Sequence, residues 1–106
     1  MDTGTEEARL ELDLGYITNG ILCHNVLEYI CPPKYGLKVL EPGCGSGKLG
    51  IWYAIRGVIV TLLDIDPNEI EYSKELWRRA RQAIHVAGSY SDPSFQVGSV
   101  HHLPFS

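Results

Sequence analysis

The chain has 106 residues, 44% of them hydrophobic, and a formal net charge of −4, which suits one small globular domain and is too apolar for a disordered segment. The negative charge argues against a domain built to bind nucleic acid, and no apolar run approaches the roughly 18 residues of a membrane span. We therefore expect neither nucleic acid nor a membrane as a partner. Three cysteines without a C-x-x-C pair disfavour a disulfide framework or a zinc site and indicate a reducing, cytoplasmic compartment.

Elements in the first half of the chain follow from apolar spacing and from chain breakers. Residues 1–15 are acidic and lack the apolar stretch of a signal peptide, so we expect a loose N-terminal lead-in. Helical spacing of apolar residues predicts a helix over 18–31, which two prolines end. A short apolar strand is expected over 36–40, a helix over 47–56 and a continuous β-branched strand over 58–63.

A clear helix start follows the second strand. Asp66 is placed as the N-cap and Pro67 at the first helical position, with Glu69 able to complete a capping box. This helix is expected to end near Gly88 and to bury one apolar stripe. The stripe consists of Ile70, Trp77, Ala80 and Ile84. A third short strand is then expected over 95–100.

Strands and helices alternate along the chain, which is typical of a parallel sheet with right-handed crossovers. The predicted fold class is therefore α/β, a Rossmann-like parallel sheet with flanking helices that looks truncated after the third strand. Residues 16–106 would form the N-terminal half of such a domain. Because the last strand would leave an open sheet edge, we expect further chain or a homo-oligomer to cover it.

The stretch "VLEPGCGSGKLG" (39–50) places four glycines directly after the first predicted strand. Such a turn lets a ligand lie against the main chain at the start of a helix. A Walker A loop is excluded twice, because Pro42 stands where its first glycine belongs and Leu49 where Ser or Thr belongs. The dinucleotide-binding fingerprint G-x-G-x-x-G fails once, because Lys48 stands where its last glycine belongs. The pattern that is present is E-x-G-x-G-x-G.

An acidic residue follows at the end of the second strand. Asp64 lies 17 residues after Gly47, close to the ~20-residue offset at which an acid meets ribose hydroxyls in nucleotide-binding βαβ units. Its carboxylate can accept hydrogen bonds from both hydroxyls. Asp66 is also acidic, but helix capping explains it.

Together these motifs resemble a known family. Residues 39–50 and "VTLLDIDPNEIEYSKE" (60–75) resemble motif I and the acidic second-strand motif of class I S-adenosylmethionine-dependent methyltransferases. "FQVGSVHHLPFS" (95–106) resembles the third-strand segment of that family, and its Leu-Pro-Phe ending looks most like the small-molecule branch. The resemblance covers about residues 16–106.

The resemblance implies roles for individual residues. The loop that contacts the methionine and ribose portion of the cofactor comprises Gly43, Cys44, Gly45 and Gly47, and Glu41 lies near the methionine ammonium. Asp64 would hold the ribose hydroxyls, with Ile65 packing on the adenine. Ser99 stands where the family often has an Asp, so its hydroxyl would accept from the adenine amino group with less charge assistance. The backbone N–H of Val100 would donate to the ring.

The chemistry of the cofactor agrees with these acids. S-adenosylmethionine carries a sulfonium and an ammonium but no phosphate, so a site built around Glu41 and Asp64 suits it. We predict S-adenosylmethionine binding and methyl transfer to a small-molecule acceptor, incomplete in this chain, with no catalytic residue or metal site assigned. Two alternatives stay open: an NAD-dependent oxidoreductase half-domain, against which Lys48 speaks, and a non-catalytic methyltransferase-like scaffold.

Overall fold

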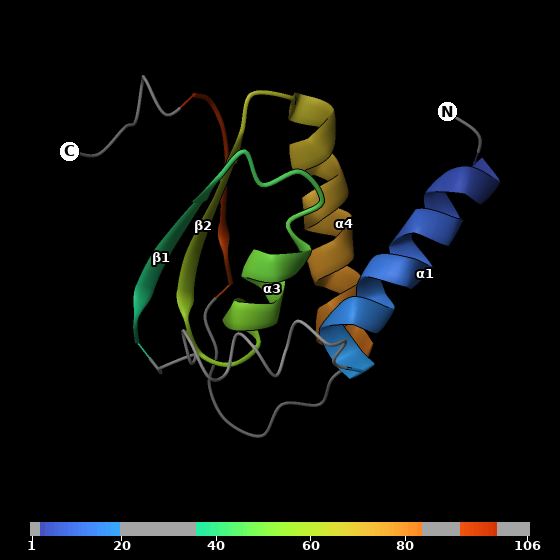
Figure 1. Ribbon diagram of the computed structural model, residues 1–106, viewed down its shortest axis with the longest axis horizontal. Coiled ribbons are helices and arrows are strands. Elements are labelled where there is room, and N and C mark those ends of the chain that lie inside the picture. The colour runs from blue at the N-terminus through green and yellow to red at the C-terminus, as the bar shows by residue number, and fades with distance from the viewer. Residues whose placement is uncertain (1–2, 20–35, 84–91, 100–106) are drawn as a thin grey trace.

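A computed structural model describes residues 3–19, 36–83 and 92–99 (Figure 1). Six elements lie in these ranges: α1 (Thr3–Asn19), β1 (Lys38–Pro42), α3 (Lys48–Ala54), β2 (Ile59–Asp64), α4 (Pro67–Ala83) and β3 (Ser94–Val97). The order of strands and helices from β1 onward is the predicted one, with boundaries shifted by only a few residues.

The three strands form a parallel sheet in the order β1-β2-β3, with β2 in the centre. Glu41 of β1 lies opposite Leu62, and Asp64 of β2 lies opposite Val97. All three strands therefore point their carboxyl ends to the same edge of the sheet. This confirms the predicted fold class, an α/β Rossmann-like arrangement with flanking helices.

The molecule is built in three layers (Figure 1). Helices α3 and α4 pack on the sheet, and α1 packs on the outer side of both helices. The core between the sheet and the middle layer is apolar: Val58, Val60 and Leu62 are buried against Ile51, Trp52, Ile70 and Leu76. The predicted stripe of α4 is confirmed at Ile70, Trp77 and Ala80.

The expectation of a loose N-terminal lead-in is wrong for residues 3–15. These residues belong to α1, which buries Leu10, Asp13 and Ile17 with 2%, 7% and 0% of their surface exposed. The spacing i, i+3, i+7 places these three side chains on one helical face. The polar Asp13 within that face, and the many acidic residues around it, hid the pattern in the sequence.

Several expectations fall on residues outside the described ranges. Most of the predicted helix over 18–31 lies there, as do Ile84 and the helix end near Gly88. The third strand was predicted at 95–100 and is observed at Ser94–Val97. Within the described part of the chain, no helix is both long and apolar enough to cross a membrane.

Candidate cofactor-binding site

The turn after β1 has a backbone that only glycine adopts readily. Gly43, Gly45 and Gly47 have φ values of +58°, +57° and +77°, a region that costs other residues roughly 1–2 kcal/mol. The turn is closed by a hydrogen bond from the Gly47 N–H to the Cys44 carbonyl at 3.0 Å. The backbone conformation of the loop thus already accounts for the glycines at these three positions.

The glycines of this loop divide into two pairs by what surrounds them. A Cβ added at Gly43 or Gly45 would meet no described residue within 4 Å, so on the described part of the chain both face open space. A Cβ at Gly47 would lie 2.9 Å from the Ser73 Oγ, and one at Gly50 would lie 2.6 Å from the Glu41 Oε2. The first pair leaves room for a ligand, whereas the second allows α3 and the loop to approach the sheet and α4.

Asp64 joins the glycine loop to the end of β2. Its Oδ2 accepts from the Gly45 N–H at 3.0 Å, and its Oδ1 accepts from the Asp66 N–H at 2.8 Å. The two strand ends that were predicted to share a ligand are therefore in direct contact. A carboxylate has about four lone-pair sites, so Asp64, which is only partly buried, can accept further hydrogen bonds.

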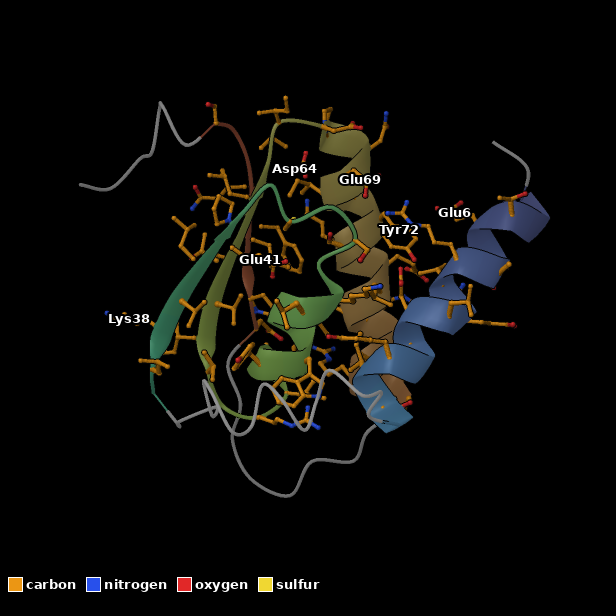
Figure 2. The ribbon with its side chains drawn as sticks, viewed as in Figure 1. Glu6, Lys38, Glu41, Asp64, Glu69 and Tyr72 are labelled. Carbon is orange, nitrogen blue, oxygen red and sulfur yellow. The ribbon has the colours of Figure 1, made fainter. Side chains whose placement is uncertain are left out.

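Glu41 lies beneath the loop rather than at its open side. Figure 2 shows its side chain between the strands and α3. Burial raises the pKa of the Glu41 carboxyl above its ordinary value, and a hydrogen bond from the Gly50 backbone N–H offsets part of that rise. The Oε2 atom is buried and has no hydrogen-bond partner among the described residues.

The start of α4 confirms one capping prediction and corrects another. Asp66 is the N-cap, because its Oδ1 accepts from the Asn68 N–H at 2.9 Å. The reciprocal half of the capping box is absent from this described segment: the Asp66 N–H donates to Asp64, and the Glu69 carboxylate accepts from Arg9 of α1 at 2.7 Å. A charged partner from α1 competes successfully for Glu69.

Ser73 is a site residue that the sequence analysis did not identify. It is fully buried in α4, and its hydroxyl lies 3.2 Å from the Gly45 carbonyl and 3.0 Å from the Ser46 carbonyl. A signal was present, because position 73 falls within the apolar stripe that contains Ile70 and Trp77. A polar residue at a buried helical position requires a partner.

The remaining predicted residues are distributed around the loop. Cys44 is buried, its N–H donates to the Leu63 carbonyl, and burial raises the pKa of its thiol to about 11. Such a thiol is protonated and is no nucleophile. Ile65 has 72% of its surface exposed beside Asp64. Ser99 is partly exposed two residues after β3, and Val100 lies outside the described residues.

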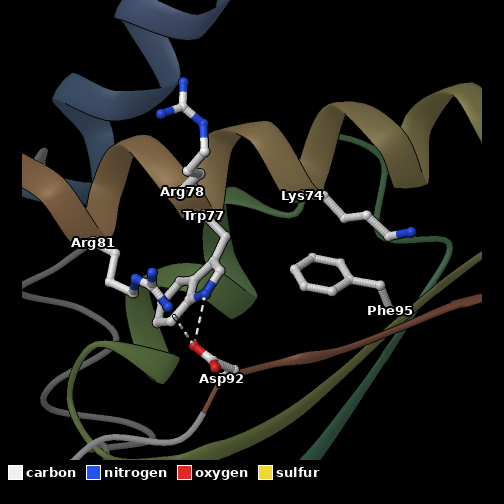
Figure 3. A pocket seen from close by; sticks show the side chains of 6 residues that line it. All are labelled: Lys74, Trp77, Arg78, Arg81, Asp92 and Phe95. Carbon is white, nitrogen blue, oxygen red and sulfur yellow. Dashed lines mark hydrogen bonds and ion pairs between the residues drawn. The ribbon is translucent and has the colours of Figure 1, made fainter.

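A separate pocket of about 350 Å³ lies between α4 and β3 (Figure 3). It is lined by Lys74, Trp77, Arg78, Arg81, Asp92 and Phe95. Asp92 accepts from the Trp77 indole N–H at 3.0 Å and from Arg81 at 3.3 Å, while Lys74 and Arg78 pair with glutamates of their own helix. Because these charges already have partners, we assign the pocket no part in the site at the strand ends.

A parallel α/β sheet with a glycine turn after β1 and a carboxylate at the end of β2 defines a Rossmann-like cofactor-binding domain. A family model described as a methyltransferase domain matches residues 40–106. The chain therefore belongs to the methyltransferase-domain family, in the class I S-adenosylmethionine-dependent group.

Two curated relatives support this membership. Over 85 residues, the chain is 35% identical to the malonyl-[acyl-carrier protein] O-methyltransferase of Erwinia billingiae, an alignment that covers 80% of this chain and 29% of that protein. Over 53 residues, it is 42% identical to the ribosomal RNA small subunit methyltransferase C of Chromohalobacter salexigens, which covers 50% of this chain and 15% of that protein. The chain thus spans less than a third of either relative.

Proposed function

We propose that this chain binds S-adenosylmethionine and takes part in transferring its methyl group to a small-molecule acceptor. The observation that carries the proposal is the contact between the glycine loop and Asp64, with a 3.0 Å hydrogen bond from the Gly45 N–H, next to the open space over Gly43 and Gly45. An adenosyl ligand lying in that space would meet bare main chain on one side and a carboxylate on the other.

The residues present fit a cationic cofactor. Glu41 has a buried carboxylate oxygen that finds no partner among the described residues, and an unpaired buried acceptor is costly unless a donor reaches it. S-adenosylmethionine supplies, when bound, a methyl group on a positively charged sulfur, and it also carries an ammonium group. In this chain, Glu41 would supply the negative potential beneath the loop and Asp64 would hold the ribose hydroxyls.

The adenine would lie beyond Asp64. Ile65, which is largely exposed, would cover one face of the ring, because apolar side chains gain by losing contact with water. Ser99 would accept from the adenine amino group, and the Val100 N–H would donate to the ring. These assignments follow the family resemblance and stay predictions.

The acceptor class is proposed from the net charge and from the longer alignment. A net charge of −4 does not suit a domain that binds nucleic acid by itself. The relative with the longer alignment is named for O-methylation of a malonyl-[acyl-carrier protein], and the other is named for ribosomal RNA. We therefore favour a small acceptor.

Calorimetric titration with S-adenosylhomocysteine, the demethylated product, tests the cofactor proposal. We expect the folded chain to bind S-adenosylhomocysteine and not NAD, and Asp64→Asn to weaken binding by about tenfold or more, since hydrogen bonds to charged groups contribute about 1.5–3 kcal/mol. Glu71→Gln is the matched control, because Glu71 is an exposed acid that pairs with Lys74. Binding of NAD instead would favour the oxidoreductase alternative, and a folded chain that binds neither would favour the scaffold.

A further inference from the structure

Ser73 occupies an unusual position for a hydroxyl in the middle of a helix. No part of its surface is exposed, and its Oγ lies 2.9 Å from the Glu69 carbonyl of its own helix, 3.0 Å from the Ser46 carbonyl and 3.2 Å from the Gly45 carbonyl. A serine hydroxyl has a single proton, and all three carbonyls are acceptors. That proton can be shared between two carbonyls in a bifurcated hydrogen bond.

The two loop carbonyls depend on that proton more than the helical one does. The Glu69 carbonyl is the i−4 acceptor of the Ser73 N–H in a regular α-helix. Among the described residues, the one additional donor to the Gly45 carbonyl is a weak one, the Cys44 thiol at 3.6 Å. A hydroxyl aimed at the loop thus satisfies groups that lie outside any regular ladder, as buried carbonyls require.

Contact between Ser73 and the loop is also close in the steric sense. A Cβ built at Gly47 would lie 2.9 Å from the Ser73 Oγ and 3.3 Å from its Cβ. The loop thus rests directly on α4 at this residue.

As a result, the Gly45 peptide groups are held from two sides. The Gly45 N–H donates to Asp64 at 3.0 Å, and the Gly45 carbonyl faces Ser73 at 3.2 Å. With the Gly45 and Ser46 carbonyls turned toward α4, the open side of the loop is free of these two acceptors.

We propose that Ser73 is a positioning residue for cofactor binding: its hydroxyl holds the Gly45 and Ser46 carbonyls against α4 and so keeps the open side of the glycine loop in its ligand-binding conformation. This inference rests on the proposed S-adenosylmethionine function and extends it to a residue that touches the loop and not the ligand.

The test compares Ser73→Ala with Ala80→Gly. Ala80 is a fully buried residue two turns further along α4, so its replacement destabilises the same helix without touching the loop. We expect both variants to lower Tm. Only Ser73→Ala should weaken S-adenosylhomocysteine binding, by roughly 3- to 10-fold, because a hydrogen bond contributes about 0.5–1.5 kcal/mol and 1.4 kcal/mol is tenfold in affinity.

Amide hydrogen exchange gives a readout that does not need a ligand. In Ser73→Ala, the Gly47 N–H, which closes the loop onto the Cys44 carbonyl at 3.0 Å, should exchange faster relative to the amides of α4 than it does in Ala80→Gly. Unchanged affinity in Ser73→Ala, or equal losses in the two variants, would overturn the positioning role while leaving the proposed function intact. If the unmodified chain binds no S-adenosylhomocysteine, the proposed function fails, and Gly47 exchange that is the same in both variants would then reject the Ser73 role separately.

Discussion

The glycine loop and helix α1 both rest on α4, but the groups that hold them differ in charge. The loop is held by backbone groups, the Ser73 hydroxyl and one carboxylate, Asp64. Helix α1 is held by its buried Leu10 and Ile17 and also by ion pairs. Arg79 donates to Glu7 at 2.7 and 2.9 Å, and Arg9 donates to Glu69 at 2.7 Å. The loop contacts are made by backbone groups and short side chains, which have little conformational freedom, whereas the long charged side chains that pair α1 with α4 tolerate more movement.

One buried polar cluster connects the two regions. Tyr72 of α4 donates its hydroxyl proton to the Asp13 Oδ2 of α1 at 2.6 Å, and the Lys48 Nζ lies 3.7 Å from the Asp13 Oδ1. Burial, and then the hydrogen bond to Asp13, raise the pKa of Tyr72 well above its ordinary range. Because Lys48 is the first residue of α3, this contact joins α1 to the helix that directly follows the glycine loop.

The largest effect is expected where the loop helix meets the sheet. Gly50→Ala should lower the free energy of unfolding by about 2–3 kcal/mol, since overpacked cores cost about that much. The added methyl group would clash with Leu62 and would lie 2.6 Å from the Glu41 Oε2. Urea unfolding measures the loss. Gly45→Ala is the control: no described residue lies within 4 Å of the added methyl group, so this variant should lose only the roughly 1–2 kcal/mol of backbone strain.

The next effect concerns the cluster under α1. Tyr72→Phe should cost about 2 kcal/mol, because it removes a hydrogen bond to a buried carboxylate. Urea unfolding of Tyr72→Phe, Asp13→Asn and the double variant forms a thermodynamic cycle. We expect the double variant to lose less than the sum of the two single losses. Strict additivity would show that the pair does not hold α1.

Glu41 offers a change with opposite effects on stability and binding. A carboxyl whose pKa is raised in the folded state lowers stability as the pH rises above the unfolded value of about 4.5. Glu41→Gln should therefore raise Tm modestly at pH 7 and reduce the fall in stability above pH 4.5. The same change should weaken S-adenosylhomocysteine binding by about tenfold, because a charged acceptor is lost. A lower Tm with unchanged affinity would contradict both expectations.

The smallest effect is the acid response of the α1 interface. A hydrogen bond from Arg79 lowers the pKa of Glu7, and hydrogen bonds from Arg78 and Arg79 lower that of Glu75 to about 2. Because the folded values lie below the unfolded ones, this stabilisation is present above about pH 4.5 and is lost as the pH falls toward 2.

Carboxyl titration by NMR checks this directly, together with amide exchange in α1. Exposed pairs contribute little, so we expect acidification to increase amide exchange in α1 only slightly while the sheet stays folded. Glu7→Gln should remove most of the acid response of the first turns of α1. A Glu75 carboxyl that titrates near its ordinary value would contradict the contacts with Arg78 and Arg79.

Local features were predictable from the sequence. Apolar runs and glycine breaks located β1, β2 and α3, and the Asp-Pro pair marked the start of α4, because turn and cap chemistry depends on residues only a few positions apart. The loop and Asp64 could also be placed together, since parallel strands deliver their carboxyl ends to one edge of the sheet. These residues alone were enough to define the fold class and to locate the candidate site.

The tertiary structure alone decided which partners these residues take. Ser73 contacts Gly45, which lies 28 positions earlier in the chain. Glu69 pairs with Arg9, 60 positions earlier, instead of completing the expected capping box. It also decided that Gly47 and Gly50 serve packing while Gly43 and Gly45 stay open. Such choices depend on distances between elements, which are set when the apolar faces of the sheet and helices pack together, and no local periodicity encodes them.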